Sequence, residues 1–270
     1  MIMKDAFKVQ PGPGVVSDAG QPLAANARLA VICPGADTPV YTYALHLAEL
    51  LDAKTRRLAP EQEADLPELT TGSDLLVVHA PPQSRLKSWL CGSAACRLVN
   101  RLPVSVLVVE KPRWPLKKIL LLTRGRRLDF AAASWVAHLA RPISAEIAVL
   151  AVQPYLAAAN CQAMFGQGID TWLASDTPLG QQLRHILNLS DTPPRRLQLQ
   201  FRGGSPDRQV RQAVLETQPD LIVIAAETGY WCERRILGEL VRPLLQQTRL
   251  PVLVAKFGFF PGRSANVHYS

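Results

Sequence analysis

The amino-acid sequence predicts an α/β protein with two tandem open sheets of a five-stranded type, mainly parallel and flanked by helices, the first sheet truncated. Apolar runs of strand length alternate with segments whose apolar residues recur at helical spacing. This alternation implies right-handed crossovers between parallel strands. Two stretches also share one layout, DLLVVHAPPQSRLKSWLCGS at 74–93 and DLIVIAAETGYWCERRILGE at 220–239. In each, an Asp opens an aliphatic run and a Gly follows it 18 residues later, so we interpret the chain as one module written twice.

The first module follows an N-terminal stretch that carries Pro and Gly without periodicity. We expect residues 1–27 to form a flexible leader and 28–112 to form the first domain. Its predicted elements are a strand at 28–33, a helix from Tyr41, a strand at 74–78, a helix at 94–100 and a strand at 104–110.

The second module begins after KPRWPLKK (111–118), which we interpret as a linker because its two prolines disfavour regular structure. Residues 113–257 should form this domain, with 258–270 as a tail. In its last predicted helices, Ser205 is an expected N-cap with Pro206 at the first helical position, and Pro243 falls in a first turn that tolerates it. The predicted strands are 118–123, 145–154, 196–201, 220–226 and 251–256, and the predicted helices are 130–140, 179–189, 205–217 and 239–248.

Glycine spacings locate what the first module lacks. Gly35 and Gly92 are 57 residues apart, whereas Gly125 and Gly238 are 113 apart, so the first module is shorter by 56 residues. That length corresponds to about one strand, one helix and one strand. We expect the missing part to fall between the first helix and 74–78, leaving KTRRL (54–58) as its remnant.

Composition excludes several classes of protein. The net charge is +8, but Lys and Arg are scattered, with short clusters only at 124–127 and 194–196, and no nucleic-acid-binding module is visible, so nucleic acid is not an expected partner. Five cysteines without a CxxC pair argue against a disulfide scaffold and a structural zinc site. No apolar run approaches the length of a membrane span, and the N-terminus lacks a signal-peptide core, which predicts a cytoplasmic protein.

The stretches around the two aspartates resemble the universal stress protein family. Two segments look like C-terminal halves of that fold: PDLIVIAAETGYWCERRILGELVRPLLQQTRLPVLVAK and SDLLVVHAPPQSRLKSWLCGSAACRLVNRLPVSVLVVEK. A third, RGGSPDRQVRQAVLETQPD, is similar to the stretch that leads into the family's fourth strand. The resemblance covers 28–111 and 116–256 and indicates the tandem class. It implies a Rossmann-like fold of the adenine nucleotide alpha hydrolase type and a role in stress response.

The resemblance also implies how the two modules pair. Family members dimerise edge to edge through their fifth strands, which 104–110 and 251–256 resemble. We therefore expect an intramolecular pseudo-dimer, with a homodimer as a further possibility. An apolar sheet edge left bare invites association, which favours this pairing. We expect Val106 and Leu253 to share one apolar layer across it.

The nucleotide-binding pattern of the family, Gly-x2-Gly-x9-Gly-Ser/Thr after the fourth strand, is altered in both modules. The first module ends in Gly92-Ser93 and the second in Gly238-Glu239, and both lack the first two glycines. The altered positions are His79 and Pro82 in the first module and Ala225 and Thr228 in the second. Pro82 removes an amide donor, and Glu239 places a carboxylate where a phosphate would lie.

The family's acidic residue after the first strand is also replaced, by Pro34 in the first module and Arg124 in the second. We therefore expect no cofactor and no tight ATP binding. Six residues remain as candidates for binding a nucleotide or another anion: Gly92, Ser93, Arg124, Gly125, Gly203 and Gly238.

Structural interpretations stand beside these functional ones. Gly92-Ser93 is more typical of a helix cap than of a phosphate site, and Arg124, with Arg126 and Arg127, is more typical of a solvated basic loop than of a phosphate clamp. A lone histidine such as His79 is more often structural, and Cys91 and Cys96 are more often inert thiols than redox groups.

We see no catalytic constellation and no metal site. The hypothesis is a tandem, non-catalytic stress-response or regulatory binding module with a protein partner. The alternative is a nucleotide- or anion-sensing regulatory module that binds its ligand weakly in the C-terminal domain. A nucleotide hydrolase would need a Walker-type loop or a pair of metal-binding carboxylates, and the sequence offers neither.

Overall fold

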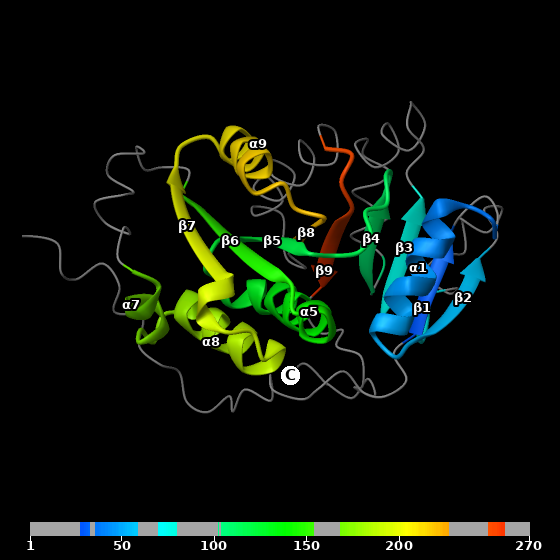
Figure 1. Cartoon of the computed structure of the whole chain (residues 1–270), viewed down its shortest axis with the longest axis horizontal. Coiled ribbons are helices and arrows are strands. Elements are labelled where there is room, and N and C mark those ends of the chain that lie inside the picture. The colour runs from blue at the N-terminus through cyan, green and yellow to red at the C-terminus, as the bar shows by residue number, and fades with distance from the viewer. Residues whose placement is uncertain are drawn as a thin grey trace, which may run out of the picture.

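The computed structural model describes residues 28–32, 36–58, 70–79, 102, 104–153, 168–226 and 248–256, and places all their strands in one nine-stranded sheet (Figure 1). The sheet order is β2-β1-β3-β4-β9-β8-β5-β6-β7, parallel throughout except where β4 meets β9. The strands are β1 (Arg28–Ile32), β2 (Lys54–Leu58), β3 (Leu75–His79), β4 (Ser105–Val109), β5 (Lys118–Thr123), β6 (Glu146–Gln153), β7 (Leu197–Gly203), β8 (Leu221–Ala226) and β9 (Val252–Lys256).

The two predicted sheets are therefore the two halves of one continuous sheet. Strands β1 to β4 form one half and β5 to β9 the other, and they join where β4 and β9 pair antiparallel. We call this β4–β9 pair the seam. Its central partners are Leu107 and Leu253, flanked by Val106 with Val254 and by Val108 with Val252. The expected adjacency of 104–110 and 251–256 is thus observed.

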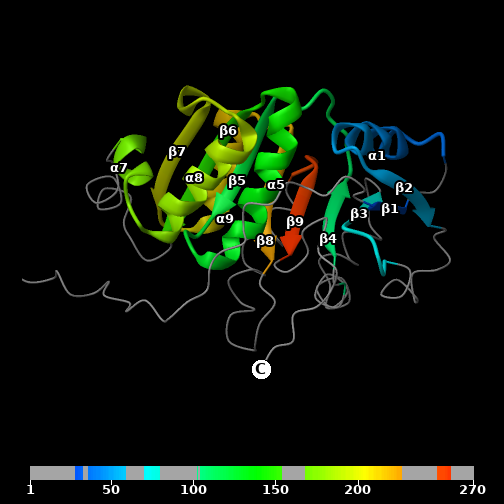
Figure 2. The ribbon, with the colours of Figure 1, turned by 90° about the horizontal axis from the view of Figure 1, so that it is seen from below.

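Helices cover both faces of the sheet (Figures 1 and 2). Helices α1 (Pro39–Leu50), α5 (Phe130–Ala140) and α8 (Pro178–Ser190) pack on one face, and α9 (Pro206–Thr217) packs on the other. The core under the first three runs without interruption across both halves and includes Leu107 and Leu253 of the seam. The remaining short elements are α7 (Ile169–Leu173), η2 (Arg127–Asp129), η3 (Arg141–Ile143) and η4 (Pro194–Arg196).

Helix starts follow from the sequence. Thr38 caps α1 by accepting from the Tyr41 amide at 3.3 Å, which starts this helix two residues before the predicted position. Thr177 caps α8 in the same way through the Gly180 amide at 3.2 Å. Helix α9 begins after Ser205, as predicted, although the Ser205 side chain makes no capping hydrogen bond.

The aspartate that opens each repeated run ties together the starts of two strands. The Asp220 carboxylate accepts from the Lys117 and Lys118 amides at 2.8 and 3.0 Å, and the Asp220 amide donates to the Lys118 carbonyl at 2.8 Å. Asp74 does the same with Arg28: its carboxylate accepts from the Arg28 amide at 2.8 Å and its amide donates to the Arg28 carbonyl at 2.8 Å. We call these pairs the aspartate clamps.

The sequence spacing within the aspartate clamps differs between the two halves by the same number of residues as the glycine spacing does. Arg28 and Asp74 are 46 residues apart, Lys118 and Asp220 are 102 apart, and the difference is again 56. The expectation of a missing strand, helix and strand is wrong in detail. Lys54–Leu58 does form a strand, and it pairs with β1 as β6 pairs with β5. What the described residues of the first half lack are counterparts of α8, β7 and α9, a helix, a strand and a helix.

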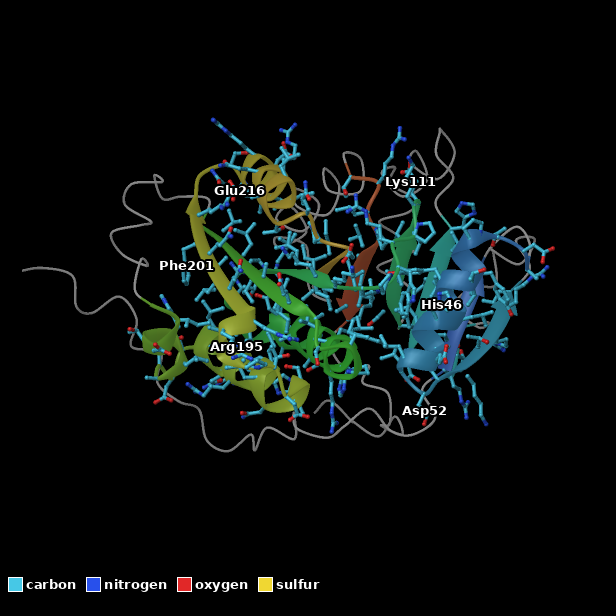
Figure 3. The ribbon with its side chains drawn as sticks, viewed as in Figure 1. His46, Asp52, Lys111, Arg195, Phe201 and Glu216 are labelled. Atoms are coloured by element: carbon cyan, nitrogen blue, oxygen red, sulfur yellow. The ribbon has the colours of Figure 1, made fainter. Side chains whose placement is uncertain are left out.

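The linker predicted at 111–118 contains no helix or strand before Lys118, and it packs against the first half. Trp114 stacks on His46 of α1 with ring centres 5.0 Å apart and meets Tyr43 edge-on at 5.9 Å (His46 is labelled in Figure 3). Leu116 is buried in the core that both halves share. The linker is thus part of the packed structure.

A polar contact crosses the seam beside its apolar pairs. The Ser105 hydroxyl of β4 accepts from the Trp135 indole of α5 at 3.0 Å and from the Lys256 amide of β9 at 3.1 Å. The Lys256 ammonium donates to the Leu102 carbonyl at 2.5 Å, and burial lowers the pKa of Lys256 to about 8. Helix α5 and strand β9 of the second half are therefore held by hydrogen bonds to Ser105 of β4 and to Leu102 before it.

Two histidines lie where α5 packs on α8. The Ser134 hydroxyl of α5 is 2.7 Å from Nε2 of His185 on α8, and Phe130 meets the His185 ring edge-on at 5.7 Å. Burial, with the neighbouring charges of His185 and Arg141, lowers the pKa of His138 to about 4, and burial lowers the pKa of His185. Burial in this contact therefore disfavours the protonated form of both side chains.

Charging the seam should unfold both halves together. The register corrects one expectation: Val106 pairs with Val254 and Leu107 with Leu253, so Val106 and Leu253 point to opposite faces. Leu107 and Leu253 are the matched pair, at 2% and 1% exposure. An Asp at either position should lower the free energy of unfolding by several kcal/mol, and the whole free energy of unfolding of such a protein is about 5 to 15 kcal/mol.

The measurement is chemical denaturation of L107D, L253D and the double variant. The double variant should lose less stability than the two single losses added, because either change already breaks the same contact. Additive losses, or one half melting normally while the other fails, would contradict a shared seam.

Acid should destabilise the α5–α8 contact through His138. Its pKa is about 4 when folded and about 6.5 when unfolded, so the unfolded chain binds more protons between these values. The folded state is therefore favoured by neutral His138 above pH 6.5, and it loses stability relative to the unfolded chain as the pH falls toward 4. In H138Q this loss should be absent, so the stability difference between wild type and variant should change by roughly 1 kcal/mol or more across that window. Parallel stability curves for the two proteins would show that His138 titrates normally.

Candidate functional site

The strand order reverses direction at β5. From β5 the chain moves to β6 and β7 on one side, and then crosses to β8 and β9 on the other. In open parallel sheets, ligands bind at such a reversal, outside the carboxyl ends of the strands. Residues 123–129 comprise Thr123, the last residue of β5, and the six residues that follow it, and they include two of the predicted candidates, Arg124 and Gly125. We call this segment the β5 loop.

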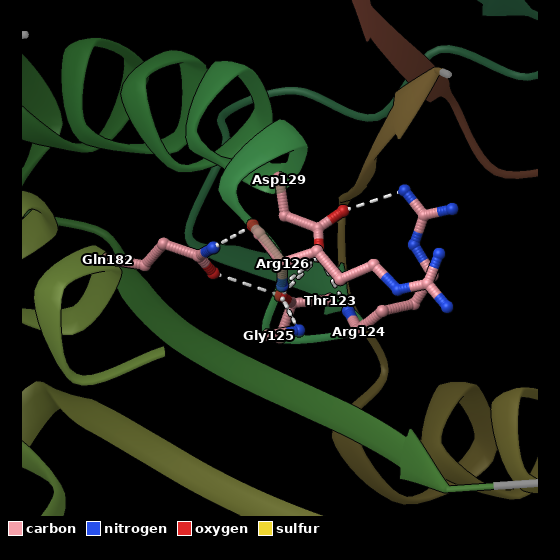
Figure 4. Close-up of polar contacts among 6 residues, drawn as sticks. All are labelled: Thr123, Arg124, Gly125, Arg126, Asp129 and Gln182. Carbon is pink, nitrogen blue, oxygen red and sulfur yellow. Dashed lines mark hydrogen bonds and ion pairs between the residues drawn. The ribbon is translucent and has the colours of Figure 1, made fainter. Parts of the chain in front are cut away.

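A buried carboxylate lies at the centre of the β5 loop (Figure 4). Oδ2 of Asp129 accepts from the Arg124 amide at 2.8 Å and from the Arg126 amide at 3.0 Å, and it lies 3.1 Å from the Thr123 hydroxyl. Asp129 is only 1% exposed. The amides that converge at this strand end are therefore already paired with an anion from the chain itself.

Arg124 adds a charge to the same carboxylate. Its Nη2 donates to Oδ1 of Asp129 at 2.9 Å, and its side chain is 12% exposed. A pair this well shielded from water is stronger than a surface ion pair, and breaking it leaves a buried charge uncompensated. Neither interpretation offered for Arg124, a phosphate clamp or a solvated loop residue, describes this arrangement.

Helix α8 fixes the other side of the loop. Oε1 of Gln182 lies 3.0 Å from the Thr123 hydroxyl, and Nε2 of Gln182 donates to the Arg126 carbonyl at 2.5 Å. The Thr123 hydroxyl also accepts from the Gly125 amide at 2.9 Å. Gly125 has φ +70°, a left-handed conformation that favours glycine, and an added Cβ would lie 3.4 Å from Cβ of Leu179. Hydrogen bonds and packing therefore set the loop's shape.

Sequence reasoning missed Asp129 and Gln182. The expected acidic residue was sought directly after the strand, where Arg124 stands, but the carboxylate comes from five residues further on. One signal was available, because Asp129 immediately precedes the apolar helix pattern at 130–140, a position where acidic side chains often accept from backbone amides. Gln182 is 59 residues from its partner and had no local signal.

Of the other predicted site residues, the structure describes Gly203, which lies away from this loop. Gly203 ends β7, two strands away from β5, which is about 10 Å across a sheet. Gly92, Ser93 and Gly238 lie outside the described residues, as do Pro34, Pro82, Thr228, Glu239 and all five cysteines. His79 ends β3, and burial lowers its pKa, which fits a structural histidine.

The described residues contain no group of three or more His, Cys, Asp or Glu side chains that could hold a metal ion. None of their helices has both the length and the apolar character needed to cross a membrane.

Comparison with known proteins gives a family and a fold. The model of the universal stress protein family matches residues 115–256, more than half of the chain. Two solved structures share the fold at low sequence identity. A universal stress protein from Archaeoglobus fulgidus DSM 4304 is 11% identical with a TM-score of 0.56, and the match covers 85% of this chain and 96% of that one. A functionally unknown protein from Pseudomonas aeruginosa PAO1 is 17% identical with a TM-score of 0.52, over 85% of this chain and 81% of that one.

No curated protein matches the sequence significantly. The family match spans β5 to β9 and therefore includes the β5 loop and one strand of the seam. The nine-stranded, mostly parallel sheet agrees with the fold of the Archaeoglobus protein. This chain belongs to the universal stress protein family.

Proposed function

We propose that this chain is a non-catalytic stress-response or regulatory binding module that does not bind ATP tightly. The observation that carries the proposal is the Asp129 carboxylate at the centre of the β5 loop. It accepts from two backbone amides and from Arg124 while being 1% exposed. The loop thus holds its own anion in the place where the fold offers donors to a ligand.

A phosphate at this loop would face two penalties. It would need the Arg124 and Arg126 amides, which Asp129 already occupies, and it would lie beside a carboxylate of the same sign. Moving Asp129 aside would leave a buried charge without its hydrogen bonds, which costs several kcal/mol. These penalties support weak nucleotide binding, in line with the altered glycine pattern.

We also propose that the two halves are tandem copies that form an internal pair. Two features support this: each half carries an aspartate clamp between equivalent strands, and the seam joins equivalent strands antiparallel, as a two-fold axis would. Because β4 occupies the open edge of β9, a second chain or a protein partner would have to bind elsewhere. We place the protein in the cytoplasm on the grounds given by its sequence.

Titration calorimetry of the full chain with ATP and Mg²⁺ tests the proposal. The Kd should be weaker than about 100 µM, which is about −5.5 kcal/mol, and no ATP should be hydrolysed. A micromolar Kd, or nucleotide retained through purification, would instead favour the nucleotide-sensing alternative. Steady ATP turnover that depends on residues of this chain would overturn the non-catalytic assignment.

Neutralising the Asp129 carboxylate should strengthen the binding of inorganic phosphate. D129N keeps the shape of the side chain but leaves Arg124 without its charge partner, so the variant should be less stable by about 3 kcal/mol and should bind inorganic phosphate more tightly than wild type. D170N, an exposed change on α7, is the matched control and should alter neither property. Unchanged phosphate affinity in a folded D129N protein would show that the carboxylate does not exclude anions.

A further inference from the structure

A cavity of about 510 Å³ lies on the face of the sheet that α9 covers, away from the β5 loop. One wall is a stripe along α9 that includes Val210, Arg211 and Val214, residues that share one face of a helix. The other wall comes from residues that precede β5 and β9, among them Arg113 and Arg249.

The second wall is held in place by contacts that cross the seam. The Lys111 amide donates to the Arg249 carbonyl at 3.2 Å, and Nε of Arg249 lies 3.5 Å from Oε1 of Glu110. Nη1 of Arg113 donates to the Pro219 carbonyl at 3.3 Å, which fixes that side chain next to the end of α9. The cavity is therefore built from both halves of the chain and depends on their pairing.

Positive charge dominates the described lining. It contains three arginines and one acidic residue, Asp207, which pairs with Arg211. Arg249 pairs with Glu110, whereas Arg113 donates to a backbone carbonyl and forms no ion pair with a carboxylate of the described residues. Each guanidinium carries five N–H donors and these contacts engage one nitrogen of each. An anion can therefore be bound without displacing them.

Apolar side chains complete the lining. Val210, Val214 and Leu250 contribute to it, and Leu215 of α9 is 76% exposed, the most exposed large apolar side chain of the described residues. Leu215 therefore extends the apolar lining of the cavity toward solvent. The volume falls in the range of sites for small organic ligands, about 300 to 1,000 Å³.

We propose that this cavity binds a small amphipathic anion, a carboxylate or phosphate monoester on an apolar body. The charged head lies at Arg113 and Arg249, and the apolar body lies along Val210, Val214 and Leu215. This goes beyond the proposed function, because it assigns the module a ligand class and a site on a different face from the β5 loop.

Binding of octanoate to the full chain, measured by calorimetry, tests the site. Octanoate should bind with a Kd below about 1 mM, and octanol and acetate, which lack the head and the body respectively, should bind at least about fivefold more weakly. Octyl phosphate and inorganic phosphate are titrated in the same way in a second set of measurements. If octyl phosphate binds more tightly than octanoate, the head is a phosphate monoester. If inorganic phosphate binds as well as octyl phosphate, the apolar wall plays no part and the proposal is overturned.

Matched variants locate the site. R113Q and L215S change exposed residues of the lining and should each weaken octanoate binding about fivefold or more. R208Q on α9 and L45S on α1 make the same chemical changes at exposed positions outside the described lining and should leave the affinity unchanged. Absence of octanoate binding, or equal effects of the lining and control variants, would overturn the proposal.

Discussion

The antiparallel pairing of β4 with β9 is the constraint on which the rest of the structure depends. It makes one sheet out of two halves, places Leu107 and Leu253 in a core that runs under α1 and α5, and supplies the Ser105 hydroxyl that Trp135 and the Lys256 amide share. It also brings the segment after β4 beside the segment before β9, which creates one wall of the cavity on the α9 face. A half without its partner would expose an apolar sheet edge.

Much of the element order could be predicted from periodicity, because the apolar runs of β3, β5 and β8 are continuous and the helices α8 and α9 are amphipathic. The repeated aspartates were visible as a pattern, and the structure supplies their reason in the two clamps. The register at the seam was not predictable. Assigning Val106 to the same layer as Leu253 was wrong because strand faces alternate with every residue, and a pattern of consecutive valines does not reveal the pairing.

The candidate site was predictable only in outline. The sequence indicated that the usual acidic residue and glycines were altered and pointed to Arg124 and Gly125, which do share one loop. It did not indicate that Asp129 turns back to fill the loop or that Gln182 reaches it from α8, because both contacts depend on tertiary packing. In this loop the Asp129 carboxylate accepts from the Arg124 and Arg126 amides, which follow the end of β5.

Strand β2 has a consequence for how large the sheet can grow. This five-residue strand forms one outer edge of the sheet, and Lys54, Arg56 and Arg57 are exposed along it. A second molecule approaching edge to edge would bring identical cations into register, and like charges on neighbouring strands repel. Charged edge strands of this kind protect native sheets against open-ended polymerisation. The same residues that make β2 a poor match to an apolar strand pattern therefore keep this edge of the sheet from templating a fibre.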